Sequence, residues 1–277
     1  MTEEGTSWPA ARVPMHTTRV GGALEALEGL IPRESGTADD SRLEMVKVEK
    51  NTLIWLDTDP QSGKQVICKM YRNRGAISWE REKRFRFRVQ REFDSLCHLQ
   101  AHGVPTTPAV SWSYGTDEEH QRFELLAMEC VPGCEPVSEL LDPDHAASGT
   151  LDLGVMYDTL REMHRAGVFH RRLDSRNILY VEESKEFLIM DTPAAIIFGH
   201  DIARSRMAWF DLFQITKPIF VLLGKPRACE LLKRYGLSER EVAGVIKDMP
   251  DRMISRGTRN RLRFEFGLRA NCSRSRA

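Results

Sequence analysis

Gly167-Val168-Phe169-His170-Arg171-Arg172-Leu173-Asp174-Ser175-Arg176-Asn177-Ile178-Leu179 is the most informative stretch of this 277-residue chain. It follows a segment with helical spacing that ends at Gly167, and it leads into an apolar strand-like segment, 178–181. Its polar residues therefore lie in a loop between two regular elements, where side chains are available to a ligand. Fourteen residues after Asn177, a second apolar segment ends in Asp191. An amide and a carboxylate placed in this way are oxygen donors of the kind that bind magnesium.

The loop resembles the catalytic loop of protein kinases, whose pattern is His-Arg-Asp-Leu-x-x-x-Asn. In that pattern the aspartate receives the proton of the acceptor hydroxyl and the asparagine holds a magnesium ion. His170 and Asn177 match the pattern, and Asp191 matches the metal-binding aspartate that follows in kinases. Arg172 stands where the catalytic aspartate is expected, and Thr192-Pro193 replaces Phe-Gly after Asp191. The combined spacing indicates a protein-kinase-like fold.

The rest of the chain predicts a two-lobed α+β fold around this loop, with a small β-rich N-lobe and a mainly α C-lobe. In the first lobe, segments with period-two alternation predict strands over 43–48, 53–56, 66–71, 109–114 and 123–130. A helical pattern predicts one helix in the same lobe, over 78–100. The second lobe is predicted to contain strands 178–181 and 187–190 and helices 151–166, 206–223, 228–235 and 239–247. The predicted domains are a flexible segment (1–40), the N-lobe (41–132), the C-lobe (133–250) and a basic tail (251–277).

Two charged residues of the first lobe are candidates for nucleotide binding. Lys69 ends the apolar run Val66-Ile67-Cys68, where its ammonium group must reach solvent or meet an anion such as a phosphate or a carboxylate. Glu92 lies on the following predicted helix, where it could pair with Lys69 and hold it toward a nucleotide. A solvated strand lysine and a solvated helix face remain the alternatives for these two residues.

Three further motifs narrow the resemblance to the bacterial lipopolysaccharide core kinases, the Kdo/heptose kinase family. These motifs are Lys69-Met-Tyr-Arg72-Asn-Arg74-Gly75, Gly103-Val104-Pro105-x-x-Pro108 and Arg206-x-x-Trp209-x-Asp211-Leu212-Phe213. The resemblance covers about residues 43–220. It implies ATP with Mg²⁺ as phosphoryl donor and a sugar hydroxyl of the lipid A core as acceptor, at the cytoplasmic face of the inner membrane.

The resemblance also implies roles for individual residues. Lys69 would contact the nucleotide phosphates, with Glu92 as its partner, and Asn177 and Asp191 would hold Mg²⁺. The candidate catalytic residues of the loop are His170, Arg172 and Asp174. Asp174 could act as the base only if the loop shifts, because residues i and i+2 of an extended segment are about 6.6–7 Å apart. The arginine that replaces the aspartate could instead bind a phosphate.

Two departures from the kinase pattern keep a second reading open, in which the protein is a catalytically inactive pseudokinase that acts as a scaffold or anion-binding regulatory module. The first is Arg172. The second is the turn Glu49-Lys50-Asn51, which lacks a Gly-x-Gly-x-x-Gly phosphate loop. Loss of the base would reduce phosphoryl transfer without abolishing it, because general acid–base help is worth about 10²–10⁴-fold.

Basic residues are concentrated between Lys69 and Arg91, where nine Lys or Arg accompany two Glu. A solvated helix face, a surface for anionic lipid or sugar phosphates, and a nucleic-acid site are the three interpretations, with nucleic acid the least favoured. A second basic run, Arg252 to Arg276, is interpreted as a frayed tail rather than a membrane tether.

The overall composition excludes several classes of protein. Forty basic residues balance forty acidic ones, so no global field favours a polyanionic partner. No apolar run approaches the roughly 18 residues of a membrane span, and the N-terminus does not resemble a signal peptide. We therefore expect a cytoplasmic protein, peripheral at the inner face of the membrane if its basic stretch binds lipid. The six cysteines form no Cys-x-x-Cys pair and are expected to be free thiols.

Overall fold

The computed structural model describes residues 44–49, 52–59, 63–72, 87–116, 122–141, 151–247 and 249. The predicted N-terminal segment, residues 73–86 of the basic stretch and the predicted C-terminal tail lie outside these described residues. The chain divides into two compact units. We call them the sheet unit, which comprises residues up to 84 and Val110–Met128, and the helical unit, which comprises Phe85–Ala109 and the residues from Glu129 onward.

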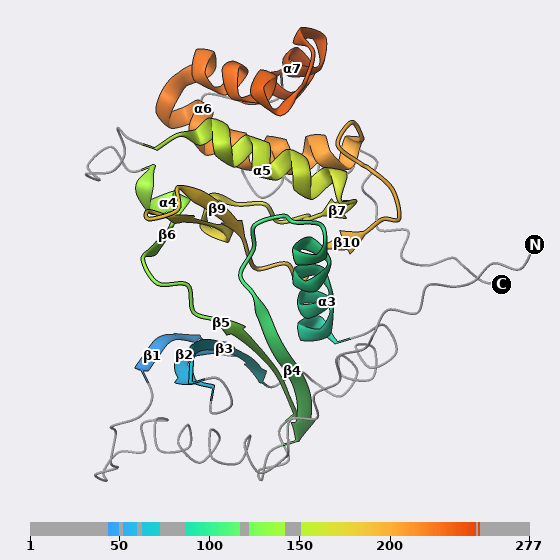
Figure 1. The fold of residues 1–277 in the computed structure, drawn as a ribbon. Coiled ribbons are helices and arrows are strands. Elements are labelled where there is room, and N and C mark those ends of the chain that lie inside the picture. The colour runs from blue at the N-terminus through green and yellow to red at the C-terminus, as the bar shows by residue number, and fades with distance from the viewer. Residues whose placement is uncertain are drawn as a thin grey trace, which may run out of the picture. The chain divides into compact units, whose positions relative to one another are not determined.

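The sheet unit contains a five-stranded sheet whose strand order is β1-β2-β3-β5-β4 (Figure 1). Its strands are β1 (Glu44–Glu49), β2 (Thr52–Thr58), β3 (Gln65–Arg72), β4 (Ala109–Thr116) and β5 (Arg122–Glu129). All five were expected from the period-two pattern, and the first three form an antiparallel meander. Alternate residues of β3 and β5 pack on Trp55 in the core of this unit: Val66, Cys68, Met70, Phe123, Leu125 and Ala127.

The helical unit combines helices with two small sheets. Its helices are α3 (Arg88–Ala101), α4 (Val137–Leu140), α5 (Leu153–Arg165), α6 (Arg206–Tyr235) and α7 (Glu239–Ile246). One sheet has the order β6-β8-β9, from β6 (Cys134–Pro136), β8 (Ile178–Val181) and β9 (Glu186–Ile189). The other pairs β7 (Val168–Phe169) with β10 (Ile196–Ile197). The longer elements match the prediction, whereas β6, β7, β10 and α4 have two to four residues and were not predicted.

The packing of α3 differs from the sequence-based division into lobes. The prediction placed this helix in the first lobe, but it belongs to the helical unit. The Arg91 Nε donates to the carbonyl of Pro193 (3.2 Å), and the His98 Nε2 lies 2.7 Å from the carbonyl of Ala166. Leu99 is part of the helical unit's apolar core. His98 therefore makes a packing hydrogen bond, and no group of three metal-binding side chains occurs among the described residues.

Helix α6 consists of two helices joined at Gly224, whose φ of 83° is left-handed. The prediction of separate helices over 206–223 and 228–235 agrees with this break. Among the described residues, α6 alone is long and apolar enough to cross a membrane by length and composition. Leu212, Ile215 and Ile219 nevertheless lie in the core of the helical unit, so this part of α6 is a core helix.

The cysteines of the described part are free, as predicted. They are Cys68, Cys97, Cys130, Cys134 and Cys229. Burial raises the pKa of the Cys68 thiol to about 12, so this residue is an inert part of the sheet unit's core.

Candidate functional site

The loop between β7 and β8 is held by hydrogen bonds from its first residue. His170 is fully buried. Its Nδ1 accepts from the backbone N–H of Arg172 (3.4 Å), so Nε2 carries the proton and donates to the carbonyl of Met190 (3.0 Å). The ring of His170 thus connects the loop to the residue that precedes Asp191. This geometry favours a positioning role for His170, because the buried ring is already committed at both nitrogens.

Asn177 and Asp191 lie at the same end of the β8–β9 pair. Ile178 lies opposite Ile189, and the N–H of Met190 donates to the carbonyl of Asn177 (3.1 Å). Met190 therefore faces Asn177, and Asp191 follows it one position further along, so the two candidate ligands lie at the same end of the strand pair. The Asn177 Nδ2 donates to the carbonyl of Arg172 (2.8 Å), which leaves its Oδ1 as an acceptor.

Backbone strain is concentrated at this site. Among the described residues, three that are not glycine have a positive φ: Arg171 (69°), Lys185 (58°) and Asp191 (55°). Arg171 and Asp191 belong to the site, and Lys185 lies in the turn between β8 and β9. A left-handed non-glycine residue costs free energy and persists where the surrounding structure holds it in place. At Arg171 this support is visible, because its backbone N–H is held by Asp211.

The donor set at this place fits magnesium only in part. One carboxylate, from Asp191, and one amide oxygen, from Asn177, are the hard oxygen ligands that Mg²⁺ takes from proteins, with substrate phosphates and water completing its octahedron. Arg176 adds a positive charge nearby, because Asp191 is among the carboxylates that raise the pKa of its guanidinium. The residues thus fit a metal that arrives together with a phosphorylated ligand.

Asp174, the candidate base, is already engaged. Its Oδ1 accepts from the backbone N–H and the Nε of Arg176 (3.1 Å each), and its Oδ2 accepts from the same guanidinium (3.0 Å). The hydrogen bonding of the Arg176 guanidinium to Asp174 is the largest cause of the raised pKa of Arg176. A carboxylate stabilised by a guanidinium is a weaker base. The geometry therefore weakens the case for Asp174 as general base, while the exposed Arg172 occupies the expected position of that base.

Lys69 and Glu92 are both buried, but they belong to different units. The Lys69 Nζ lies 5.5 Å from the ring centroid of Tyr71 on the same strand. Glu92 is on α3, where its backbone carbonyl accepts from the hydroxyl of Thr192 (3.4 Å), the residue after Asp191. The predicted pairing of Lys69 with Glu92 remains a prediction.

Asp211 on α6 is a site residue to which the sequence gave no role. Its Oδ2 accepts from the backbone N–H of His170 (2.8 Å), and its Oδ1 accepts from that of Arg171 (2.9 Å). Gln214, one turn later, donates to the carbonyl of Arg171 (3.3 Å). Asp211 is fully buried. It therefore holds the start of the loop, including the left-handed Arg171, in a fixed position.

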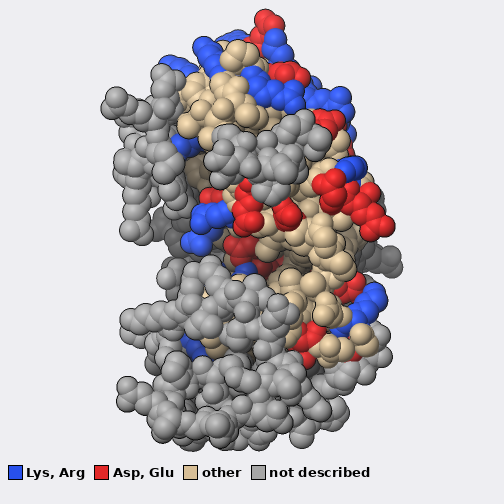
Figure 2. Space-filling model, turned by 90° about the vertical axis from the view of Figure 1, so that its left-hand side faces the viewer, with Lys and Arg blue, Asp and Glu red and all other residues tan. Residues whose placement is uncertain are grey.

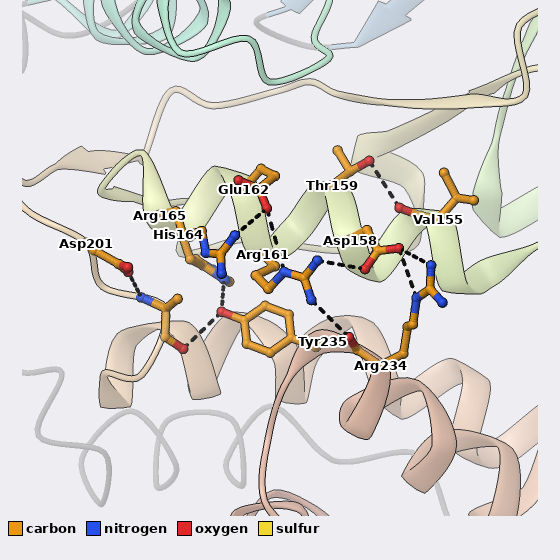
Figure 3. Close-up of polar contacts among 11 residues, drawn as sticks. Val155, Asp158, Thr159, Arg161, Glu162, His164, Arg165, Asp201, Arg234 and Tyr235 are labelled. Carbon is orange, nitrogen blue, oxygen red and sulfur yellow. Dashed lines mark hydrogen bonds and ion pairs between the residues drawn. The ribbon is translucent and has the colours of Figure 1, made fainter.

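A buried polar network extends from Asp211 to the end of α6, and Figure 3 shows its part around His164 and Tyr235. The His164 Nε2 lies 3.4 Å from the carboxylate of Asp211, and its Nδ1 lies 2.8 Å from the hydroxyl of Tyr235. That hydroxyl donates to the carbonyl of Ala203 (3.0 Å). Burial raises the pKa of Tyr235. The network connects α5 and both halves of α6 to the candidate catalytic loop.

One sequence signal could have revealed these residues. Asp211 interrupts the apolar run Trp209-Phe210-Asp211-Leu212-Phe213, and a carboxylate inside a core helix must have partners. His164 likewise falls at a helical interval from Leu160, on the apolar face of α5. Neither signal identifies the partner.

Comparison with known proteins places this fold in a family. Residues 49–195, more than half of the chain, match the Lipopolysaccharide kinase (Kdo/WaaP) family. A solved structure described as WaaP in complex with acyl carrier protein is similar over 92% of this chain and 96% of that chain, with a TM-score of 0.52 and 15% sequence identity. No curated protein matches the sequence. The likeness to WaaP confirms the predicted mixed fold, with a β-sheet N-terminal part and a helical C-terminal part.

Proposed function

This chain belongs to the lipopolysaccharide kinase (Kdo/WaaP) family, and from that premise we propose that it transfers a phosphoryl group from ATP, with Mg²⁺, to a sugar hydroxyl of the lipopolysaccharide core. The cytoplasmic face of the inner membrane is the proposed place of reaction, since ATP and the lipid-linked acceptor meet there.

One observation carries the proposal. Met190 bonds through its N–H to the carbonyl of Asn177 and through its carbonyl to the ring of His170. These two bonds fix Met190 against the catalytic-loop segment, so Asp191, the next residue, lies at the same end of the strand pair as Asn177. An amide oxygen and a carboxylate next to a kinase-like loop are the pair that phosphoryl transfer uses to hold a metal–nucleotide complex.

Each residue then has a proposed role. Asn177 and Asp191 hold the metal, and Lys69 contacts the nucleotide phosphates. Bound magnesium would neutralise charge that develops on the transferred phosphoryl group. Asp211 and His170 keep the loop in its binding conformation.

Turnover is expected to be slow, because the loop has no free carboxylate at the position of the base. Arg172 is exposed there, and Asp174 is bound to Arg176. Positioning and electrostatics supply most of the rate of phosphoryl transfer, whereas a general base contributes about 10²–10⁴-fold. We therefore propose that the protein is a weak kinase. Arg172 makes the acceptor-binding part of the site basic and binds an anionic group of the acceptor.

Two arginines of the loop favour a second candidate function, an anion-binding module without turnover. Arg172 and Arg176 are both exposed cations on one loop. Such a loop suits a protein that binds a phosphorylated ligand and retains it.

The first experiment is ATP binding by calorimetry with and without Mg²⁺. Metal-dependent binding that is lost in Asp191→Ala, and kept in the control Asp201→Ala, is the expected result. Asp201 suits the control because its carboxylate is exposed and caps a turn through the N–H of Ala203 (2.7 Å). Unchanged magnesium-dependent affinity in a folded Asp191→Ala variant would show that the metal assignment is wrong.

The second experiment separates the weak kinase from the inactive module. Arg172→Asp places a carboxylate at the position of the base, and a weak kinase should then hydrolyse or transfer the phosphoryl group about 10²-fold faster or more. An inactive module should show no gain in turnover and a weaker affinity for ATP, since it loses a cation.

A further inference from the structure

Three consecutive large apolar side chains are exposed on α6. Val221, Leu222 and Leu223 are 43%, 46% and 47% exposed. The other exposed large apolar residues of the described part are single or separated in sequence, at Val110, Tyr114 and Ile197. Scattered exposed apolar residues are ordinary, whereas a contiguous group marks an interaction surface.

Val221, Leu222 and Leu223 lie where the apolar face of α6 continues beyond the residues that pack in the core. Leu212, Ile215 and Ile219 follow helical spacing and are buried. The next positions of that face, Leu222 and Leu223, should be buried as well, but the chain leaves the helical conformation at Gly224. Successive helical residues differ by about 100° around the axis, so three exposed neighbours cover more than half of the helix circumference. The end of this helix therefore protrudes from the core.

The charged residues nearest to the group in the sequence are basic, and the first acidic residues on either side are Asp211 and Glu230. From Leu212 to Cys229 the chain contains Lys217, Lys225 and Arg227 and no acidic residue. Lys225 is exposed next to the break, and Arg227 pairs with Glu230 (2.7 Å). Figure 2 faces the side on which α6 turns in Figure 1, and shows uncharged surface on the helical unit with Lys and Arg beside it and some Asp and Glu among them.

We propose that Val221–Lys225 is a membrane-docking tip that inserts its apolar side chains into the interface of an anionic bilayer, with Lys225 at the lipid phosphates. The choice of a bilayer as partner rests on the proposed function, in which the acceptor is lipid-linked. Apolar side chains flanked by lysine are the composition that interfacial segments use. The tip lies on the membrane without spanning it, because α6 breaks at Gly224 and the residues before the tip belong to the core.

The test is co-sedimentation of the full chain with vesicles of phosphatidylethanolamine alone or mixed with phosphatidylglycerol. Leu222→Gln with Leu223→Gln should weaken binding to mixed vesicles about 30-fold, since about half of each leucine remains to be transferred from water. Lys225→Gln should weaken binding to mixed vesicles about 5-fold and leave binding to neutral vesicles unchanged. Ile197→Gln is the control, because it removes an apolar side chain of similar exposure (40%) elsewhere on the helical unit. Circular dichroism verifies that each variant is folded.

Hydrogen exchange locates the contact without a substitution. Vesicles should slow exchange of backbone amides in 219–227. Absence of binding by the unmodified chain would overturn the proposal, and so would protection confined to another region such as 73–86. Loss of self-association in the leucine variant, measured by analytical ultracentrifugation, would show that the tip joins two copies of the chain and would also overturn it. None of these measurements contains nucleotide, so their failure is distinguishable from failure of the proposed kinase activity.

Discussion

Replacement of Asp211 by alanine should release the candidate catalytic loop from the body of the helical unit. The carboxylate accepts the backbone N–H groups of His170 at 2.8 Å and Arg171 at 2.9 Å, and it is fully buried. No other hydrogen bond from these two N–H groups is found in the described part of the chain. Alanine would therefore leave two buried donors without acceptors.

The loss of stability expected for Asp211→Ala follows from these two hydrogen bonds. A hydrogen bond to a charged group contributes about 1.5–3 kcal/mol, and removal of one member of a buried charged network costs about 3–5 kcal/mol. We expect Asp211→Ala to lose about 3–5 kcal/mol. Asp211→Asn keeps one of the two oxygens and should lose about 2 kcal/mol.

Two measurements test this expectation. Urea unfolding gives the change in stability, and native-state hydrogen exchange reports the amides of His170 and Arg171 directly, which should exchange at least about 100-fold faster in Asp211→Ala. Asp158→Ala is the control, because Asp158 also pairs with two arginines but lies at the surface, and it should cost about 1 kcal/mol or less. The reasoning is refuted if the two variants lose equal stability and both loop amides keep their wild-type exchange rates.

Three further substitutions test other parts of the helical unit. Gly167→Ala should cost about 3 kcal/mol by urea unfolding, because φ is +78° and the new methyl group would overlap backbone carbonyl oxygens, whereas Gly199→Ala, with open space around it, should be nearly neutral. Tyr235→Phe should cost about 1–3 kcal/mol by the same measurement, since a buried imidazole and a buried carbonyl lose their hydroxyl partner; a neutral result would count against the network. Ser238→Ala removes a capping box and should cost about 1 kcal/mol at neutral pH. Its hydrogen bonds lower the pKa of Glu241 from 4.5, so that contribution is present above pH 4.5 and is lost as the pH falls through the lowered value; unfolding measured at pH 7 and pH 3 should show the difference between wild type and variant shrinking.

The sequence identified the regular elements well because their signals are local. Alternating residues specify β3 and β5, and helical spacing with an N-terminal Ser or Asp specifies α5 and α7. Such a periodicity depends only on residues that are close together in the chain, so the local sequence contains the whole signal. The shortest strands lack such a signal, because two or three residues cannot show a period and form a strand only when a partner is present.

The part of the candidate site that depends on local spacing could also be predicted from the sequence. The spacing of Asn177 and Asp191 is a feature of one hairpin, in which the β8–β9 pair sets Met190, the residue before Asp191, opposite Asn177. The engagement of Asp174 was not predictable, since the spacing of two residues to Arg176 allows a salt bridge without requiring it. The turn of helix that follows Asp174 is what aligns the two side chains.

By itself, then, the sequence determined the order of elements, the kinase-like loop and the residue types that can hold a metal and a phosphate, because each is written within a few tens of residues. Tertiary structure alone decided that α3 packs with the helical unit, that Asp211 holds the loop 40 residues before it, and that the end of the first half of α6 is left uncovered. The reason is physical. A buried polar group or an apolar face must find a partner, but which partner it finds depends on the packing of segments far apart in the chain.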